Sequence, residues 1–369
     1  MSRTGAARLG RASQKLAAEL RKRIESGKLA GGDYLPTVRD LCSDHGVSID
    51  TVSRALKSLE GDGLIVAEPR QGYRVQARAG DPLKGHPVAY VPAVLPQGAE
   101  SEAFQEMLSG AFQRAAAERG WSLLGVSASG ATPAQIMEQL RTARACGVIL
   151  DNMDRELLAL VERAGMPAVM VDAWEEHTRL DVVVQDNYRG GYLAAEHLAE
   201  KGHERVAWFG PVGDSPLSRE RFGGACAAMA AAGLKPPETY QLNFPGGLTD
   251  EERRGRARKL LTTKECPRGV LALWGPLCAA VVSAGRELGL EPGRDLDVVG
   301  WSPEEAYVKV FTAAFERRGD LPPTILWSAE EMARTAVARL GQRRENPDLP
   351  PLRVSVSTRL QLPLKNSEE

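Results

Sequence analysis

The stretch LPTVRDLCSDHGVSIDTVSRALKSLEGDGLIVAEPRQGYRV, residues 35–75, predicts a helix, a tight turn, a second helix and a two-stranded wing. Thr37 is a favourable N-cap for the first helix, and Asp40 three residues later completes a shortened capping box. Gly46 makes the turn, and Ser48 caps the second helix. This end of the chain is therefore expected to fold as a helix–turn–helix followed by a β-hairpin.

The second predicted helix has one apolar face and one polar, partly basic face. Val52, Leu56 and Leu59 fall on the apolar face at helical spacing. The polar face carries Asp50, Ser53, Arg54 and Lys57. Short strands are expected at 64–67 and 73–75. A short helix of this kind, held by a turn against a partner helix, can enter the major groove of DNA.

The residues expected to contact double-stranded DNA lie at the start of the first helix, along the second helix and on the wing. They are Thr37, Arg39, Ser48, Asp50, Thr51, Ser53, Arg54, Lys57, Arg70, Gln71 and Gly72. Arg39 and Arg54 are expected chiefly at phosphates, because a guanidinium pairs well with phosphate oxygens.

Charge is distributed unevenly along the chain. Residues 1–80 contain 14 Lys and Arg against 9 Asp and Glu, a net charge of +5. The whole chain contains 47 and 48, so the remaining residues contain 33 and 39 and carry −6. A solvated basic surface would have the same charge. Together with the two helices and the wing, however, a basic N-terminal module favours phosphate binding.

Composition indicates a globular protein of two or three domains. Its 369 residues can bury real cores, and 43% apolar and 26% charged residues are ordinary values. No apolar run approaches the roughly 18 residues of a membrane span, and the basic N-terminus lacks the apolar segment of a secretory signal. Five dispersed cysteines favour reduced thiols, so we expect a cytoplasmic protein with no membrane partner.

Patterns typical of catalytic and metal sites are missing from the sequence. It contains no G-x-S-x-G elbow, no Walker loop and no H-E-x-x-H. The five His residues do not have the spacing of metal ligands. We therefore expect a protein that is not an enzyme and that carries no cofactor and no metal.

From Val88 onward, short apolar runs alternate with helical patterns. The runs predict buried strands: VAYV, LLGV, GVILD, AVMVD, DVVV, RVAWFG, GVLALW, LDVVGW and TILW. Helical stretches such as 102–120, 134–145 and 330–342 lie between them. This alternation favours a parallel, doubly wound α/β architecture. The region is large for one such sheet, so we expect two lobes.

The predicted fold class is therefore α/β. A winged helix–turn–helix occupies residues 1–76, a polar linker residues 77–87, and a two-lobed domain with doubly wound parallel sheets residues 88–363. Ligands in such sheets bind outside the carboxyl ends of the strands. Two facing lobes would form a cleft there.

The segment IESGKLAGGDYLPTVRDLCSDHGVSIDTVSRALKSLEGDGLI, residues 24–65, resembles the winged helix–turn–helix of GntR-type bacterial transcription regulators. The matching motifs are Gly27-Lys28-Leu29, Asp33-x-Leu35-Pro36 with Arg39, Gly46-Val47-Ser48, Thr51-Val52, Ala55-Leu56 and Leu59-x-x-x-Gly63-Leu64. Family members usually place basic residues early in the recognition helix, where this chain has Ile49 and Asp50. The resemblance implies DNA binding with an altered sequence preference.

A second segment, VVVQDNYRGGYLAAEHLAEKGHERVAWFGPVGDSPLSRERFGGACAAMAAAGL, is similar to the effector domain of LacI/GalR-type repressors. The matching motifs are Asp186-Asn187-Tyr188, Gly190-Gly191, Gly202-His203 and Ser218-Arg219-Glu220-Arg221-Phe222-x-Gly224. The likeness extends, more weakly, over nearly all of residues 87–362. It implies the fold of periplasmic sugar-binding proteins, a hinge between lobes, a homodimer and a small-molecule effector.

This resemblance also implies effector-binding residues. Arg221 stands where the family places an Arg that grips the ligand. Asp151, followed by Asn152, and Asp172 end two apolar runs, where an acidic residue often meets a sugar hydroxyl. Three tryptophans at or near strand ends either stack on a ligand or fill the cleft: Trp274, Trp301 and Trp327.

Two acids usual in that family are absent here. Gly275-Pro276 and Trp301-Ser302 stand in their places. Because hydroxyl donors need acceptors, this argues against a neutral sugar held in the family's usual way. A buried Arg221 would also need an anionic or strongly hydrogen-bonding partner. We therefore expect an acidic or phosphorylated effector, an aromatic one, or none.

Taken together, these patterns predict a homodimeric DNA-binding regulator that reads an inverted-repeat operator and answers to a small-molecule effector. Repression rather than activation rests on the resemblance alone. One alternative is a regulator with a filled cleft that acts through dimerisation or a protein partner. Another is a ligand-binding protein with a vestigial DNA head. An enzyme fused to a winged helix is disfavoured, because the body is too short for the aminotransferase-like domains that such heads sometimes carry.

Overall fold

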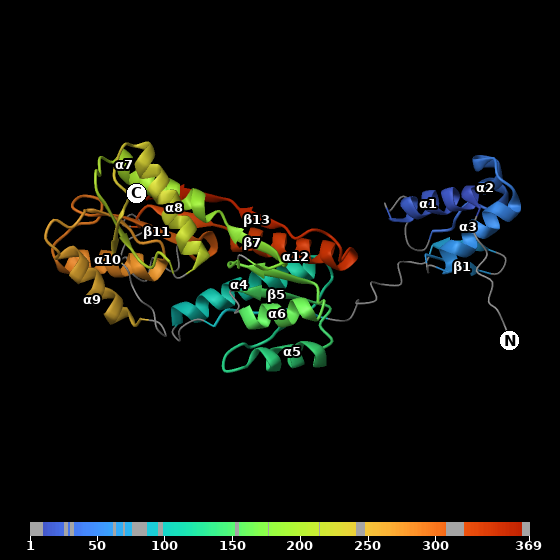
Figure 1. The fold of residues 1–369 in the computed structure, drawn as a ribbon, viewed down its shortest axis with the longest axis horizontal. Helices are drawn as coiled ribbons and strands as arrows, with labels where there is room; N and C mark the ends of the chain where they lie inside the picture. The colour runs from blue at the N-terminus through green and yellow to red at the C-terminus, as the bar shows by residue number, and fades with distance from the viewer. Residues whose placement is uncertain are drawn as a thin grey trace, which may run out of the picture. The chain divides into compact units, whose positions relative to one another are not determined.

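The computed structural model describes residues 10–25, 29, 33–61, 64–68, 71–75, 87–94, 99–151, 155–175, 177–213, 215–240, 248–307 and 321–363. The chain divides into two compact units, residues 1–84 and 85–369 (Figure 1). We call the smaller unit the head and the larger unit the body. The division lies within the predicted linker, most of which is outside the described residues.

The head has the predicted helix–turn–helix and wing. Its elements are α1 (Arg11–Glu25), α2 (Val38–His45), α3 (Ile49–Gly61), β1 (Ile65–Glu68) and β2 (Gly72–Val75). The two strands pair antiparallel. β1 lies one residue later than the expected 64–67, and β2 begins one residue before the expected 73–75. One buried cluster joins the three helices to the wing: Leu16, Ala17, Leu20, Leu29, Leu35, Leu41, Val52, Ala55, Leu56, Leu59, Ile65 and Val75. The predicted apolar face of α3 is therefore confirmed as its buried face.

The predicted helix caps of the head are also present. The Thr37 hydroxyl accepts the backbone N–H of Asp40 at 3.2 Å, and the Asp40 carboxylate accepts the backbone N–H of Thr37 at 3.1 Å. Gly46 ends α2 in the left-handed region, with φ 62°, which favours glycine. The Ser48 hydroxyl accepts the backbone N–H of Thr51 at 3.3 Å. These caps set the angle at which α3 leaves the turn.

The body contains two lobes, each built around a six-stranded sheet. Lobe 1 has the strand order β13-β7-β6-β5-β3-β4, and all of its pairings are parallel. Its strands are β3 (Val88–Val91), β4 (Leu123–Gly125), β5 (Gly147–Asp151), β6 (Ala168–Val171), β7 (Asp181–Gln185) and β13 (Arg353–Val356). The helices α4 (Ala99–Glu118), α5 (Pro133–Thr142), α6 (Arg155–Arg163) and α12 (Ala329–Glu345) flank it (Figure 1).

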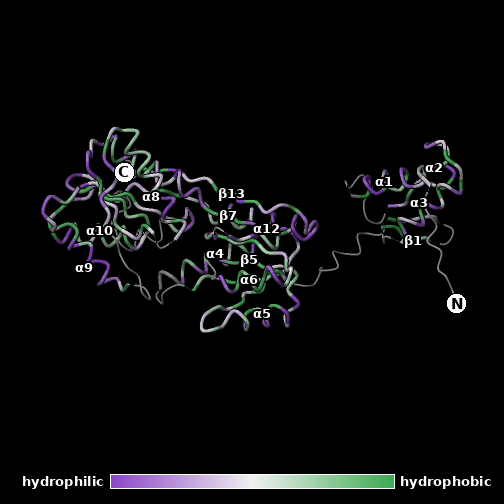
Figure 2. The backbone as a smooth tube through the Cα atoms, viewed as in Figure 1, coloured by the Kyte–Doolittle hydropathy of each residue, from purple (hydrophilic) through white to green (hydrophobic). Residues whose placement is uncertain are grey.

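Lobe 2 has the strand order β14-β12-β11-β10-β8-β9, with only β14 antiparallel to its neighbour. Its strands are β8 (Val206–Phe209), β9 (Glu238–Tyr240), β10 (Gly269–Leu271), β11 (Asp297–Pro303), β12 (Thr324–Trp327) and β14 (Thr358–Gln361). Its helices are α7 (Asn187–Glu200), α8 (Pro216–Ala231), α9 (Asp250–Leu261) and α10 (Gly275–Glu287). Figure 2 shows the apolar colour concentrated in the interior of the body and a hydrophilic α9 on its surface.

The described chain passes between the lobes three times, after β7, after β12 and between β13 and β14. Two of these passages lie side by side, because the Asp186 N–H donates to Val356 O at 2.8 Å and the Thr358 hydroxyl donates to Asp186 O at 3.1 Å. The third passage leads from β12 of lobe 2 into α12, which packs on α4 and on the sheet of lobe 1. Such a set of short parallel passages is typical of a hinge.

Three strands were not among the predicted runs: β9, β13 and β14. All three lie at sheet edges and mix polar with apolar residues, as in RVSV and TRLQ. Edge strands bury one side only, so they lack the continuous apolar signal of the inner strands.

Candidate functional site

The exposed face of α3 is the first candidate site. Asp50, Arg54 and Lys57 are exposed on it, as predicted, and Ser53 is half-buried. An ion pair of 2.7 Å joins Arg54 to Asp50 one turn earlier. Ile49, which precedes them, is 63% exposed although it is apolar. The face therefore combines an apolar tip with charged groups behind it.

The other predicted DNA contacts surround this face. Thr37 and Arg39 are exposed at the start of α2, and Ser48 is exposed at the start of α3, next to a half-buried Thr51. Gln71 and Gly72 are exposed on the wing, where Gly72 has a φ of 105° that favours glycine. Arg70 lies outside the described residues. A positively charged or hydrogen-bonding side chain thus occurs on α2, on α3 and on the wing.

A hydrogen-bonded brace that was not foreseen in the sequence orients the wing. The Tyr34 hydroxyl lies 2.5 Å from a carboxylate oxygen of Glu68 and also contacts the side-chain carbonyl of Gln71. Arg74 donates to the same Glu68 at 2.5 Å. The Tyr34 hydroxyl, and then Arg74, hold the pKa of Glu68 below its usual range. These contacts tie Gln71, at the turn of the wing, to the segment that precedes α2.

The second candidate site lies where the carboxyl ends of the lobe 1 strands meet lobe 2. Asp151, at the end of β5, accepts hydrogen bonds from the Tyr90 hydroxyl at 3.2 Å and from the Ala93 N–H at 3.4 Å. Asp172, just after β6, accepts one from the Gln185 amide at 2.6 Å. Tyr90, Asp151 and Gln185 are each at most 5% exposed. Four neighbouring strands, β3, β5, β6 and β7, thus supply one row of polar groups.

Arg221 of lobe 2 joins this row from α8. Its guanidinium donates to Asn187 Oδ1 and Leu273 O at 2.8 Å each, and to Gln185 Oε1 at 3.3 Å. Its Cζ lies 3.9 Å from the centre of a Trp301 ring, and the Trp301 indole N–H donates to the same Gln185 oxygen at 2.6 Å. We call Tyr90, Asp151, Asp172, Gln185, Asn187, Arg221 and Trp301 the interlobe cluster.

Two glycines of the DNYRGG motif make room for this cluster. A Cβ on Gly190 would lie 2.3 Å from the Trp301 ring, and a Cβ on Gly191 would lie 1.9 Å from the backbone carbonyl of Arg221. The motif therefore packs the start of α7 closely against α8 and β11. This close approach positions the Arg221 side chain over the end of β7.

Burial dominates the electrostatics of the interlobe cluster. Desolvation, and then the neighbouring Asp172, raise the pKa of Asp151 to about 7. Desolvation raises the pKa of Asp172 to about 6, although Arg221 opposes this. Desolvation lowers the pKa of Arg221 to about 10. Within the described parts of the chain, neither carboxylate forms an ion pair, so the protonation of both can change near neutral pH.

The structure brings together four of the six predicted effector residues: Asp151, Asp172, Arg221 and Trp301. Trp274 instead packs against the core of lobe 2, and Trp327 is buried at the carboxyl end of β12. Asn152 lies outside the described residues. Ser302, in the place of a usual acid, is buried and donates to the Pro303 carbonyl at 3.1 Å.

Arg221 does not depend on an effector for its partners. Three acceptors and an aromatic ring of the chain itself surround its guanidinium. Gln185 and Asn187, which supply two of these acceptors, were not among the predicted site residues. Gln185 did carry a signal, since it ends the apolar run of β7 just as Asp151 ends that of β5.

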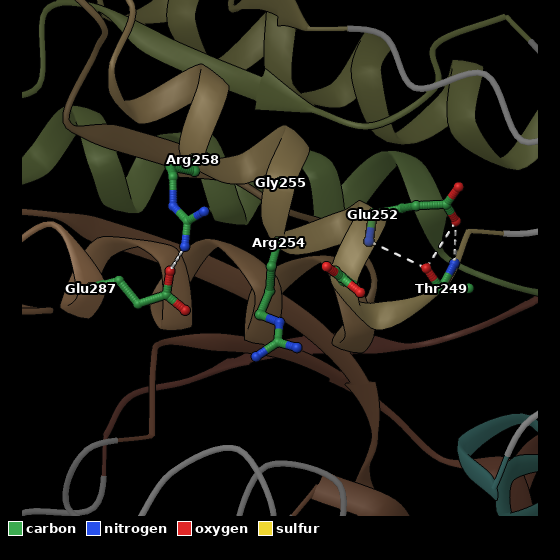
Figure 3. A pocket seen from close by; sticks show the side chains of 7 residues that line it. Thr249, Glu252, Arg254, Gly255, Arg258 and Glu287 are labelled. Atoms are coloured by element: carbon green, nitrogen blue, oxygen red, sulfur yellow. Dashed lines mark hydrogen bonds and ion pairs between the residues drawn. The ribbon is translucent and has the colours of Figure 1, made fainter.

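Two surface hollows lie away from both candidate sites. One, of about 500 Å³, lies along α9 and α10 and is lined by charged residues of both signs (Figure 3). Arg258 pairs there with Glu287, and Glu252 serves as a cap partner of Thr249. The other, of about 390 Å³, includes Met166 and Arg179. Neither hollow concentrates unpaired polar groups in the way that a built binding site does.

Two other kinds of feature are absent from the described residues. Among them, no helix is long and apolar enough to cross a bilayer. The same residues contain no group of three or more His, Cys, Asp or Glu side chains arranged to hold a metal ion.

Family models match parts of both units. Residues 12–75 match bacterial regulatory proteins of the gntR family. Residues 89–253 match the periplasmic binding proteins and sugar binding domain of LacI family, and residues 195–362 match the periplasmic binding protein-like domain.

Similar proteins are transcription regulators. The HTH-type transcriptional repressor PurR of Actinobacillus pleuropneumoniae is 26% identical over 167 residues, 45% of this chain and 49% of that protein. The HTH-type transcriptional regulator DegA of Bacillus subtilis is 27% identical over 283 residues, 72% and 81% of the two chains. The uncharacterized HTH-type transcriptional regulator YjiR of Escherichia coli is 48% identical over 69 residues, 19% and 15%. The chain spans about half the length of the PurR proteins it matches.

Solved structures share the fold. The transcriptional regulator CelR–cellobiose complex superposes with a TM-score of 0.62 at 21% identity, covering 86% of this chain and 90% of that one. The lac repressor dimer bound to operator and the anti-inducer ONPF superposes with a TM-score of 0.61 at 18% identity, covering 74% and 92%.

Proposed function

We propose that this chain, which joins a GntR-type winged helix–turn–helix to a LacI-type periplasmic-binding-protein-like domain, is a DNA-binding transcription regulator controlled by a small-molecule effector. The observation that carries the proposal is the exposed, charged face of α3 within a capped helix–turn–helix. Such a helix fits the major groove, and the surrounding basic residues neutralise phosphates. PurR is a repressor by name, which favours repression here.

The proposed DNA contacts are the exposed groups of the head. They are Thr37, Arg39, Ser48, Asp50, Thr51, Ser53, Arg54, Lys57, Arg70, Gln71 and Gly72. One head covers only a half-site, so a two-fold homodimer reading an inverted repeat would provide the affinity of an operator. The lac repressor structure in the comparison is a dimer bound to operator, which supports this assembly.

The proposed effector site is the interlobe cluster. Asp151, Asp172, Arg221 and Trp301 lie where three passages of the chain link two lobes, so a ligand there can favour one lobe arrangement over another. Trp274 and Trp327 remain proposed contacts from their places at strand ends. The shift in lobe arrangement would change how the two heads of the dimer engage their half-sites.

A second candidate function is regulation without an effector. The observation that favours it is that Arg221 already donates three hydrogen bonds within the chain, to Asn187, Leu273 and Gln185, with Trp301 against its face. In this case the chain's own side chains occupy the place of a ligand. The protein would then act through dimerisation or a protein partner.

Operator selection and a salt titration test DNA binding. The full-length protein should select a preferred inverted repeat from random duplex DNA, and should sediment at about twice 39.8 kDa. In an Arg39→Ala, Arg54→Ala double variant, operator affinity should fall, and the slope of log K against log salt should decrease by about 1.8 per subunit. Fluorescence anisotropy at several salt concentrations measures both quantities.

A matched double variant, Arg254→Ala with Arg256→Ala, removes the same charge from the exposed surface of α9 and should leave the slope unchanged. Full affinity in the Arg39→Ala, Arg54→Ala variant would refute the assignment of the DNA-binding face. A monomer that binds a non-repeated site with full affinity would refute the proposed assembly.

A further inference from the structure

We propose that Ile49 reads the 5-methyl group of a thymine in the major groove and so sets part of the operator sequence. The inference rests on the proposed function, since it assigns a specificity role to a residue of the proposed DNA-binding head. It concerns a position for which charge gives no reason to expect a DNA contact.

Ile49 has no role in the core of the head. It is 63% exposed, whereas the aliphatic residues Val52, Leu56 and Leu59 of the same helix are at most 1% exposed. It is the first residue of α3, immediately after the capping Ser48. An isoleucine held in water at a well-defined helix start gains free energy only when a partner covers it.

The neighbours of Ile49 define the kind of partner. Ser53 and Lys57 follow it at four-residue spacing, so the three side chains form one line along α3. Asp50 and Arg54 form a second line beside it and pair with each other at 2.7 Å. An apolar tip flanked by a hydroxyl and by charged groups does not match the apolar centre typical of a protein–protein interface. It does match a nucleic-acid surface, where phosphates flank the base edges.

The position of Ile49 on the helix selects the base. In helix–turn–helix proteins, residues at the N-terminal end of the recognition helix approach the base edges, and later residues lie closer to the backbone. Of the four bases, only thymine presents a methyl group in the major groove. A branched aliphatic side chain at this position therefore favours thymine over cytosine, guanine and adenine.

Removing the methyl group from the DNA tests the contact directly. The probe is the duplex selected by the full-length protein, in which each thymine is replaced in turn by deoxyuridine. Deoxyuridine keeps the hydrogen-bonding groups of thymine and lacks only its methyl. One position in each half-site should weaken binding about three- to fivefold, the change expected for one methyl group taken out of an apolar contact.

The Ile49→Ala variant completes a double-mutant cycle between this side chain and the thymine methyl group. It should bind the thymine duplex more weakly than the wild type, and should no longer distinguish thymine from deoxyuridine at that position. Deoxyuridine effects at other positions should remain. Leu362→Ala, which shortens a 52% exposed leucine of the body, should leave the whole deoxyuridine profile unchanged.

The outcomes separate this inference from the proposed function. Failure to select any DNA would overturn the proposed function and the inference together. Selective DNA binding in which Ile49→Ala keeps the full thymine preference would overturn the inference alone. So would an Ile49→Ala protein whose sedimenting mass changes, because Ile49 would then contact another copy of the chain.

Discussion

Asp151 combines nearly complete burial with a neighbouring carboxylate. It is 5% exposed, and burial followed by the proximity of Asp172 raises its pKa from 3.8 to about 7. The folded protein therefore holds this proton more tightly than the unfolded chain does. The contribution of Asp151 to the free energy of unfolding is therefore fully present below about pH 4. It falls as the pH rises to about 7 and is constant above that pH.

Replacing Asp151 with Asn should remove this dependence. Asn can still accept from the Tyr90 hydroxyl but cannot ionise. The melting temperature of Asp151→Asn minus that of the wild type should therefore increase from pH 4 to pH 8. A full shift of three pKa units corresponds to at most about 4 kcal/mol of unfolding free energy, which is a difference of several degrees in melting temperature. Differential scanning fluorimetry across this pH range measures the difference.

Asp295→Asn is the control, because Arg294 holds the pKa of this partly exposed carboxylate below its usual range. Its difference from the wild type should have the opposite sign, since a lowered pKa stabilises at higher pH. A pH-independent difference for Asp151→Asn would show that the carboxyl of Asp151 is not desolvated in the folded protein.

At the residue scale, the two acids of the interlobe cluster could be predicted from the sequence, but their hydrogen-bond partners could not. Asp151 and Asp172 were predictable because a charged residue interrupts an apolar strand at its end. Tyr90 lies within the apolar run VAYV, so its hydroxyl gave no separate signal. The contact of Gln185 with Trp301 joins residues 116 positions apart, and only the folding of both lobes brings them together.

At the element scale, α12 is the most consequential connection of the body. It follows β12 of lobe 2 but packs on lobe 1, where Arg339 and Arg343 pair with Asp181 at the start of β7 at 2.9 and 2.8 Å. Asp181 is completely buried, and it also accepts the Leu352 N–H at 2.7 Å. Arg339 further donates to the carbonyl of Pro350 at 2.7 Å. This ion cluster holds the segment between α12 and β13 against lobe 1.

We expect Asp181→Ala to destabilise the body by about 3–5 kcal/mol, because one buried and one half-buried guanidinium would lose their anion. Glu238→Ala removes the partner of Arg205 in an exposed pair and should cost less than about 1 kcal/mol. Urea unfolding followed by circular dichroism compares the two. If Asp181→Ala does not fold, Asp181→Asn keeps the acceptor and isolates the charge. Equal midpoints for the Asp181 and Glu238 variants would contradict the proposed role of the cluster.

Elements were predictable where a single segment determines its own structure. The caps at Thr37 and Ser48 and the apolar face of α3 are local, and so are the inner strands with their continuous apolar runs. The edge strands β9, β13 and β14 depend on pairing with distant segments. For β13, that partner is β7, more than 150 residues earlier in the chain. The pattern of apolar residues within a four-residue strand cannot indicate which distant strand it pairs with.

At the scale of the whole body, the interlobe cluster decides between the two candidate functions. It links Gln185 of lobe 1 to α8 and β11 of lobe 2 through direct hydrogen bonds. An effector can shift the arrangement of the lobes only if it binds one arrangement more tightly than another. The remaining ionisable acceptors of the cluster are the carboxylates of Asp151 and Asp172. Because Arg221 already has partners within the chain, these acceptors favour a ligand with hydroxyl or ammonium donors over the acidic effector expected from the sequence.

A thermal-shift screen of the full-length protein should identify such a ligand among sugars, amines, sugar phosphates and aromatic acids. At 100 times its dissociation constant, a ligand that binds only the folded state adds about 2.7 kcal/mol of stability. Asp172→Asn should weaken binding of this ligand by about tenfold while retaining operator binding, because a charged acceptor is replaced by a neutral one. Asp295→Asn should change neither binding constant.

The same ligand must be coupled to DNA. If it changes operator affinity by some factor, the operator must change ligand affinity by that same factor. Calorimetric titrations with and without the operator duplex, paired with anisotropy titrations with and without the ligand, measure both directions. A ligand that binds without coupling would contradict effector control. A different outcome would favour regulation without an effector. It requires that nothing in the screen binds and that Trp301→Ala, which removes the ring beside Arg221, retains wild-type operator affinity. The chain's own side chains would then fill the place of a ligand in the interlobe cluster.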